Sequence, residues 1–515
     1  MRSRDSRTLK HCRKAALLAV LPLTACATHE LELAPSSPDK PWTIPDSVDV
    51  PPSGSAVPMP IREPNASTPE LAKQARDASL ARLPQENAVS IDQGRHYDLA
   101  ALIDLAQRKN PETREAWEKA RQAALGVGLA ETAYVPQLSA EVVGGYQHTP
   151  LPIPPTLVPQ GFFISDTREL IPSLTAKWLL FDFGQRAGAE ETARANSFVA
   201  NVAFTGAHQK LIYAVCRDYF SLGAARGRLR VALQALKTAG VVQEAAESKQ
   251  SQGLATVVEV AQARRQTAQA RFNLEKAIGA EHGAYAALIA SVGVLPSTHL
   301  QTKDSSELKL PANPSGNVDQ FVQTALANRP DIIAAFGKVR AAEGTLKSAR
   351  GAYFPTVGLE GQIYQNMGAL SADGSPYFPI NKPGGNILLK LSVPLYDGGA
   401  RDAHVALAES DIFAARAALD QSRDTATRQV TDAYDALHTS YAEYVAALAL
   451  TEAAQTSYDA ALDAYRHGVG TFTTLATEET ALSQAQSAKE DAHANVFTAA
   501  AALAFATGAI LSAVH

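Results

Sequence analysis

Four segments of the chain alternate apolar with polar residues, the pattern of a β-strand whose two faces meet different surroundings. They cover roughly residues 138–147, 173–180, 356–363 and 387–395. The two members of each pair are separated by a loop, so the pattern predicts two β-hairpins with strands of ~10 residues. Aromatic residues lie near the strand ends: Tyr134, Tyr146, Trp178, Phe181, Tyr353, Tyr364 and Tyr396. The arrangement is typical of transmembrane β-barrel strands, although a half-buried sheet of a soluble protein alternates in the same way.

Long alanine-rich segments of helical character follow each predicted hairpin. We expect one helix from about Arg186 to Ser248 and another from about Arg401 to Tyr465, each on the order of 90–100 Å long. In the second helix apolar residues recur at steps of four and three, as in a coiled-coil seam. The seam consists of Val430, Tyr434, Leu437, Tyr441, Tyr444 and Leu448. Helices of this length cannot form a globule alone, so they are expected to pack side by side.

Each long helix is expected to turn back in a helical hairpin. Gly253 and Gly468 suit the end of a helix because glycine adopts left-handed backbone angles. Thr256 and Thr471 follow three residues later and can cap a return helix. The return helices are expected over residues 257–292 and 472–511.

The segment that joins strand to long helix occurs twice. Leu391–Arg401 repeats Ala176–Arg186 at an offset of 215 positions (396 − 181). Asp182 and Asp397 can accept hydrogen bonds from the unpaired N–H groups of a helix start. Gly184 and Gly399 permit backbone angles that a side chain would forbid. Since the similarity extends over most of both halves, the chain contains a duplicated structural unit.

The N-terminus resembles a bacterial lipoprotein signal. Six basic residues precede an apolar run from Ala15 to Leu23, which is too short to span a bilayer as a retained helix. The run ends in Leu23-Thr24-Ala25-Cys26, which resembles a lipobox whose cysteine receives acyl chains such as palmitate. Ordinary cleavage after Ala27 is the alternative, because Ala25-Cys26-Ala27 also fits a signal-peptidase site. Lipidation at Cys26 is the favoured interpretation.

These patterns divide the chain into five parts. Residues 1–25 are the predicted signal peptide, and residues 26–95 form a linker rich in proline and serine that is expected to be extended or disordered. The first repeat covers 96–294, a second linker covers 295–316, and the second repeat covers 317–515.

Composition excludes several classes of protein. The formal net charge is −5, so the basic footprint of a nucleic-acid-binding protein is absent. Three cysteines make no disulfide framework, and Cys216 is expected to be a small buried apolar residue. The sequence holds no metal tract, no nucleotide fingerprint and no H-E-x-x-H or G-x-S-x-G motif. We therefore expect no cofactor, no metal and no enzymatic activity.

Four strands are too few to close a membrane barrel, which requires about eight. Open sheet edges are not tolerated in lipid, because their N–H and C=O groups would have no partners. If the four predicted strands span a membrane, several chains must therefore share one barrel.

The duplicated arrangement resembles the TolC-type outer-membrane efflux family, in its lipoprotein branch. The resemblance covers roughly residues 96–511 and includes the runs Asn328-Arg329-Pro330-Asp331 and Tyr396-Asp397-Gly398-Gly399. It implies a mainly α fold with a transmembrane β part, in which a homotrimer builds a twelve-strand β-barrel and a periplasmic α-helical tunnel. It also implies an exit duct that conducts substrates passively from a periplasmic adaptor and an inner-membrane pump. The protein would lie in the outer membrane, anchored to its lipid, and extend into the periplasm.

The resemblance places the periplasmic entrance of the duct at the two helical hairpins. Glu259 matches an acidic residue that lines the aperture in relatives, and Tyr465 matches a tyrosine that helps to close it. Gly470, Thr474 and Thr477 stand where relatives have charged residues. Glu478 and Glu479 lie just beyond and are the remaining acidic candidates. Thr256-Val257-Val258-Glu259 also fits a capping box, so Glu259 has an equally good local role.

Two other classes of function compete with an exit duct. A coiled-coil surface adhesin or scaffold has no transport role and predicts strands at one chain end, whereas these hairpins are internal and duplicated. A periplasmic enzyme is opposed by the missing motifs and the repetitive helices. The transported substrate and the class of pump are not readable from the sequence.

Overall fold

The computed structural model describes residues 33–42, 95–156, 159–294, 299–306, 308–311 and 316–513. The signal segment and Cys26 lie outside these residues. The chain forms two compact units, and each contains segments from both halves of the duplicated sequence. One unit, here called the sheet unit, includes residues 119–201 and 334–421. The other, the hairpin unit, includes residues 35–118, 202–333 and 422–515.

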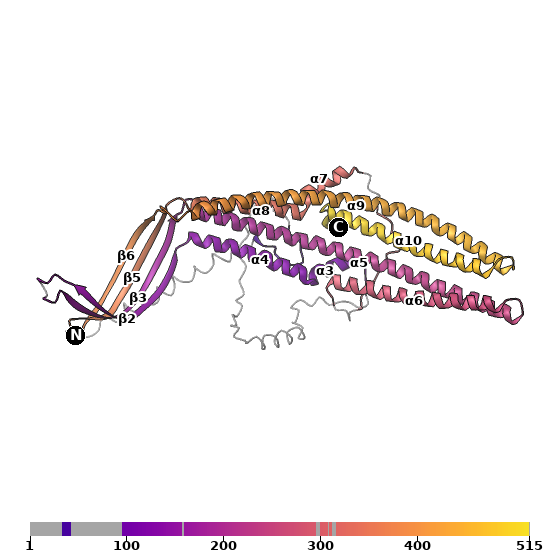
Figure 1. Cartoon of the computed structure of the whole chain (residues 1–515), viewed down its shortest axis with the longest axis horizontal. Helices are drawn as coiled ribbons and strands as arrows, with labels where there is room; N and C mark the ends of the chain where they lie inside the picture. Colours follow the sequence, from indigo (N-terminus) through magenta and orange to yellow (C-terminus); the bar gives the residue numbers. More distant parts are fainter. Residues whose placement is uncertain are drawn as a thin grey trace. The chain divides into compact units, whose positions relative to one another are not determined.

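The sheet unit contains a four-stranded antiparallel sheet (Figure 1). Its strands are β2 (Gln137–Pro152), β3 (Phe162–Phe181), β5 (Thr356–Ala372) and β6 (Phe378–Ser392), in the order β2-β3-β5-β6. The two predicted hairpins are both present. They join through β3 and β5, with Leu174 opposite Ile363, so each repeat contributes half of one continuous sheet. Strands β2 and β6 are its edges.

The strands are longer than the expected ~10 residues. They contain 16, 20, 17 and 15 residues, because in each hairpin the pairing continues into residues that were expected to form the loop between the strands. Proline lacks the N–H that a central strand needs, and Pro172 lies where β3 has no registered partner on β5, between Arg168 and Ser173. Pro379 and Pro383 lie on β6, whose outer side is an edge of the sheet.

The helices follow the predicted order. The long helices are α5 (Gln185–Ser251) and α9 (Ala400–Arg466), of 67 residues each, and their return helices are α6 (Val257–Val292) and α10 (Phe472–Ala506). The predicted helix to Leu511 is interrupted, because Gly508 has a φ of +74° and the chain resumes as α11 (Ile510–Ala513). The shorter helices are α3 (Leu99–Lys109), α4 (Pro111–Glu131), α7 (Val318–Asn328) and α8 (Pro330–Gly351), and a 3-10 turn covers Thr132–Tyr134. None of the described helices combines the length and apolarity that crossing a bilayer as a helix requires.

Glycines allow α5 and α8 to pack closely within the sheet unit. A Cβ atom at Gly188 would lie 2.3 Å from Ser348 N, and one at Gly344 would lie 2.8 Å from Thr192 N. The Thr192 hydroxyl meanwhile donates to Ala341 O across this contact, at 3.1 Å. The two helix backbones therefore approach to a distance that a larger residue at either glycine would prevent.

The largest core lies in the hairpin unit, where α3, α5, α6 and α11 contribute apolar side chains. A second core contains the predicted seam of α9: Val430 and Leu437 are buried, and Tyr434, Tyr441 and Tyr444 pack partly against them. Leu448, the last predicted seam residue, is exposed in the single chain. Cys216 is buried in the first core as expected, and burial raises the pKa of its thiol to about 12.

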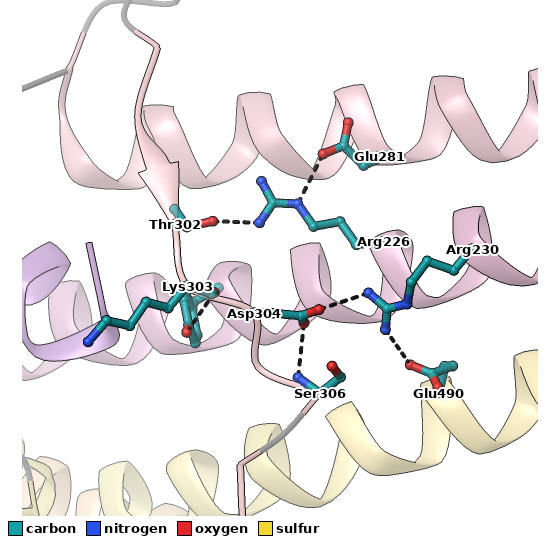
Figure 2. Close-up of polar contacts among 9 residues, drawn as sticks. Arg226, Arg230, Glu281, Thr302, Lys303, Asp304, Ser306 and Glu490 are labelled. Atoms are coloured by element: carbon teal, nitrogen blue, oxygen red, sulfur yellow. Dashed lines mark hydrogen bonds and ion pairs between the residues drawn. The ribbon is translucent and has the colours of Figure 1, made fainter. Parts of the chain in front are cut away.

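An ion-pair cluster fixes the linker between the repeats to three helices (Figure 2). Linker residues Gln301–Thr302 form β4, which pairs in parallel with β1 (His96–Tyr97). Arg226 of α5 donates to Glu281 of α6 at 3.2 Å and to the Thr302 hydroxyl at 2.7 Å. The next cation on this face of α5, Arg230, joins the linker to α10. It contacts Asp304 at 2.9 Å and Glu490 at 3.3 Å.

The described part of the predicted N-terminal linker is not free of contacts. Residues 33–42 lie against the helices, and Ala34 and Pro35 are buried. Composition indicates a scarcity of large apolar residues, but it does not show which side chains of other elements hold this segment by its backbone. For the predicted linker as a whole, an extended or disordered chain stays a prediction.

Candidate functional site: hairpin ends and strand–helix switches

The first strand–helix switch is organised around Asp182, between β3 and α5. Its carboxylate accepts hydrogen bonds from Arg186 N at 2.7 Å, Arg186 Nε at 3.0 Å and Gly184 N at 3.4 Å. Gly184 has a φ of +100°. Phe183 has a φ of +51°, a strained angle for a residue with a side chain, and its ring stacks on Phe354 at 5.6 Å.

Arg186 completes this switch from the first turn of α5. Its guanidinium donates to Leu179 O at 2.7 Å, Leu180 O at 3.0 Å and Ala133 O at 2.9 Å, and it lies 4.7 Å from the centre of the Tyr134 ring. One side chain therefore satisfies carbonyl groups at the end of β3 and of the preceding turn. Arg186 and Asp182 are both nearly buried. Their mutual hydrogen bonds, and those from Arg186 to the carbonyl groups at the strand end, take the place of bonds to water that burial removes.

The second switch repeats this geometry at the same offset. Asp397 accepts from Arg401 N at 3.2 Å, Arg401 Nε at 2.7 Å and Gly399 N at 3.2 Å. Arg401 donates to Pro394 O at 2.8 Å and lies over the Tyr353 ring. Gly398 and Gly399 both have positive φ angles, +72° and +86°. This pair is more exposed than the first.

The two hairpin ends are capped unequally. At the first, the Thr256 hydroxyl accepts from Glu259 N at 3.2 Å while the Glu259 carboxylate accepts from Thr256 N at 3.0 Å, a complete capping box. At the second, the Thr471 hydroxyl accepts from Thr474 N at 3.2 Å. Thr474 stands where the first hairpin has Glu259, so the returning carboxylate bond has no counterpart there.

Tyr465 and Lys249 link the two hairpins. Lys249 Nζ of α5 lies 4.2 Å from the centre of the Tyr465 ring of α9 and 3.4 Å from Tyr465 O. The Tyr465 side chain is 7% exposed, and its hydroxyl has no hydrogen-bond partner among the described residues. Burial, reinforced by the charge of Glu259, raises the pKa of Tyr465. Sequence reasoning missed Lys249, which carries no motif and is recognisable only from its contact.

The other two acidic candidates lie on α10 and differ in environment. Glu478 is half-buried, whereas Glu479 is 6% exposed and has no hydrogen bond or ion pair to any described residue. Burial raises the pKa of Glu479 to about 7. Glu479 lines a cavity of about 530 Å³ between α5, α6 and α10, together with the ion pair of Arg228 and Asp491. Its carboxyl group is thus held among helices of its own chain.

Exposed apolar side chains surround both hairpin ends. Leu254, Val257 and Val258 at the first hairpin and Val469 at the second are all more than half exposed. No group of three or more His, Cys, Asp or Glu side chains within the described residues is placed to hold a metal ion.

Comparison with known proteins identifies the family. The sequence profile of the family described as "Outer membrane efflux protein" matches residues 102–294 and 321–509, which is most of the chain. The chain belongs to this family. The two matched segments lie within the two predicted repeats. The protein is an outer-membrane efflux channel, and the scaffold or adhesin alternative finds no support.

Relatives of this efflux protein match it over most of their length. Protein CyaE of Bordetella pertussis is 28% identical over 68% of this chain and 72% of its own. The cation efflux system protein CusC of Escherichia coli K12 is 26% identical over 64% and 69%. The crystal structure of CusC superposes with a TM-score of 0.68 at 24% identity, covering 80% of this chain and 92% of that one. The CmeC outer membrane channel of Campylobacter jejuni gives 0.70 at 18% identity, covering 88% and 94%. The structural likeness confirms the fold class of a helical part combined with a β part.

Proposed function

We propose that three copies of this efflux protein share one β-barrel and one helical tunnel, which together form the outer-membrane duct of a tripartite export system. The sheet supplies the observation that carries the proposal. Four antiparallel strands with two unpaired edges cannot stand alone in lipid, where every backbone group needs a partner. If β2 of one copy pairs with β6 of the next, three copies give twelve strands and leave no edge.

The exposure of apolar side chains on the sheet supports a lipid-facing outer surface. Leu138, Val142, Ile363, Ile387, Leu389 and Leu391 share one face by the strand register and are all more than half exposed. The opposite face carries Lys177, Glu360 and Lys390, with Lys177 and Glu360 3.7 Å apart. An apolar outer face and a charged inner face are what a water-filled barrel in a membrane requires.

The hairpin ends are the proposed periplasmic entrance. Glu259, Tyr465, Glu478 and Glu479 line or close it in this proposal, with Lys249 as the cation that holds Tyr465 in place. The exposed apolar side chains at the hairpin tips, such as Leu254 and Val469, fit a surface that docks a periplasmic adaptor. The adaptor and an inner-membrane pump supply the substrate and the energy, and the duct conducts passively without enzymatic activity.

Lipidation at Cys26 is the proposed anchor. One relative, SilC of Salmonella typhimurium, is described as a probable outer membrane lipoprotein. Chain length supports the same role here: the seven residues from Cys26 to Leu33 span at most about 25 Å. Leu33 O accepts from Asn201, which lies 16 residues (201 − 185), or about 24 Å, along α5 from the strand–helix switch. Seven extended residues are therefore long enough to bring a lipid on Cys26 to the level at which the strands end.

Single-channel recording in planar lipid bilayers tests the duct. We expect purified wild-type protein to insert as trimers of low conductance, and the Tyr465→Ala variant to conduct several-fold better, because the interhairpin contact with Lys249 is lost. Lys276→Ala is the matched control, since this exposed lysine of α6 lies away from Tyr465. If neither wild type nor Tyr465→Ala conducts although both are trimeric in detergent, the proposal of a duct is wrong.

A further inference from the structure

The N-terminal segment of residues 33–42, here called the strap, is held by its backbone carbonyl groups. Three of them lie in the hairpin unit and meet donors from two helices. The Trp117 indole of α4 donates to Pro35 O at 2.7 Å. From α5, the Thr205 hydroxyl donates to Trp42 O at 2.8 Å, and His208 Nε2 donates to Pro38 O at 3.1 Å. In the sheet unit, Asn201 donates to Leu33 O at 2.6 Å.

This pattern of contacts is that of a recognition cleft for a proline-rich peptide. The strap sequence Pro35-Ser36-Ser37-Pro38 contains two prolines, which lack a backbone N–H, so it has few backbone donors. Its carbonyl groups remain available to accept hydrogen bonds from donors on an aromatic-lined surface. The cleft provides an indole, an imidazole and a hydroxyl as donors. Pro35 is buried, so the segment is seated in the cleft and not merely adjacent.

His208 lies at the centre of this cleft and is 0% exposed. Its Nε2 faces Pro38 O, a pure acceptor, so Nε2 carries the proton. Nδ1 lies 3.3 Å from the amide nitrogen of Gln107 on α3 and accepts from it. The edge of the ring meets Phe204 at a centroid distance of 4.7 Å. Both nitrogens of the neutral imidazole therefore have a hydrogen-bond partner. A second proton would sit on Nδ1, where it would face the amide donor of Gln107 in a site without access to water.

We propose that the cleft between α3, α4 and α5 is a docking site for the strap, and that protonation of His208 releases the strap. The charged group that acts on the ring among the described residues is Asp39 of the strap itself. Burial outweighs the effects of Asp39 and of Pro38 O and lowers the pKa of His208 from 6.5 to about 4. Release of the strap opens this site to water, so the pKa of His208 rises toward its ordinary value of about 6.5.

The sign of the pH dependence follows from this difference. Above about pH 6.5 His208 is neutral in both states and docking is independent of pH. As the pH falls from about 6.5 to about 4, only the released state binds the proton, so the docking equilibrium shifts toward release by up to about two orders of magnitude. Strap docking does not depend on the proposed duct or on the lipid anchor, so it can fail or hold independently of them.

A nitroxide spin label at Ser36→Cys measures docking in the full-length protein in detergent. Ser36 is exposed beside the buried Pro35, and signal from the native thiols is subtracted using unsubstituted protein. We expect an immobile spectrum at pH 7.5, a growing mobile fraction between pH 6 and 4, and recovery on return to pH 7.5. A label at Lys276→Cys on α6 is the matched control and is expected to keep the same mobility throughout.

Substitutions in the cleft complete the test. His208→Ala is expected to give a mobile label at pH 7.5, while His208→Gln, which keeps an N–H donor but does not titrate, is expected to stay immobile down to pH 4. If His208→Ala does not fold, Trp117→Phe removes one donor without touching the ring and should raise the mobile fraction several-fold. Equal mobility of the label in wild type, His208→Ala and Trp117→Phe at pH 7.5, or a rise in mobility between pH 6 and 4 in His208→Gln as large as that of wild type, would overturn the proposal.

Discussion

At the scale of single residues, the two strand–helix switches perform the same task with different burial. The Asp182 and Arg186 side chains are 7% and 11% exposed, whereas Asp397 and Arg401 are 32% and 16% exposed. Breaking a buried pair strands a charge away from water, while breaking a partly hydrated pair does not. The same substitution is therefore expected to reduce the free energy of unfolding more in the first copy of the motif than in the second.

We predict that Asp182→Asn lowers the free energy of unfolding by on the order of 3 kcal/mol, because it leaves Arg186 uncompensated. Asp397→Asn, the matched substitution in the second copy, is expected to cost about 1 kcal/mol. Thermal unfolding followed by circular dichroism in detergent compares them directly. Equal losses in the two variants would show that the burial difference has no energetic consequence.

Glu479 gives a pH-dependent prediction. Its pKa of about 7 lies above that of an unfolded glutamate, so the folded state holds the proton longer and loses stability as the pH rises from about 4.5 to about 7. Glu479→Gln removes this loss. We expect the variant to match wild type near pH 4.5 and to be more stable by on the order of 2–3 kcal/mol above pH 7. Unfolding midpoints measured across this pH range check the prediction, and Glu478→Gln, beside it on α10 and only half-buried, is the control for removal of one carboxylate.

The switches also show what the sequence could reveal at this scale. Asp182, Gly184, Asp397 and Gly399 were recognisable because the motif repeats at one offset, and the partner arginines repeat with them. Lys249 and His208 were not recognisable. Their contacts join residues that lie more than a hundred positions apart, and no periodicity records which side chains a fold brings together.

At the scale of elements, alternation with a period of two predicts that a segment is a strand and which residues share a face, but not its neighbours. The pairing of β3 with β5 joins the two repeats, and nothing in either hairpin alone specifies it. Strand length was underestimated for a related reason. Residues such as Pro150 and Pro152 read locally as a loop, yet they continue β2 because β3 lies opposite them. By contrast, the helix lengths followed from alanine-rich periodicity because helical hydrogen bonds are local.

The linker cluster yields a prediction about an element. Asp304 and Glu490 are held by Arg230 in a partly hydrated setting, whereas Arg226 and Glu281 are more buried. Arg226→Met leaves Glu281 and Thr302 without their donor. We expect amide hydrogen exchange in residues 299–306 to accelerate at least tenfold, because β4 is then held to the helices by fewer bonds.

A matched variant distinguishes a local effect on residues 299–306 from a general loss of stability. Arg108→Met removes an exposed ion pair with Asp104 on α3 and is expected to change stability by no more than about 0.5 kcal/mol. Its effect on exchange in residues 299–306 should be undetectable. If Arg226→Met also leaves that exchange unchanged, the cluster does not hold the linker.

At the scale of the whole molecule, the two unpaired edges of the sheet determine what can pair with them. Strand β2 ends the sheet on one side and β6 on the other, and both are antiparallel to their inner neighbours. In a closed barrel of even strand number every edge meets the opposite edge of another copy. Since the four-stranded sheet carries one of each, identical copies can close a ring without a second kind of chain.

Cysteine cross-linking across these edges tests the closure. Ser139 on β2 shares the polar face of the sheet with Asn386, Leu388 and Lys390 on β6, because the register connects them through β3 and β5. We expect Ser139→Cys, combined in turn with cysteine at each β6 position, to give covalent dimers and trimers in membranes, strongest for one pairing and nearly absent for either single variant. Combining Ser139→Cys with cysteine at Leu389, on the opposite face, should not cross-link because side chains on opposite faces of a strand cannot meet. If no covalent dimers or trimers formed, or if the pair on opposite faces cross-linked as well as the pairs on the polar face, a barrel shared between copies would be contradicted.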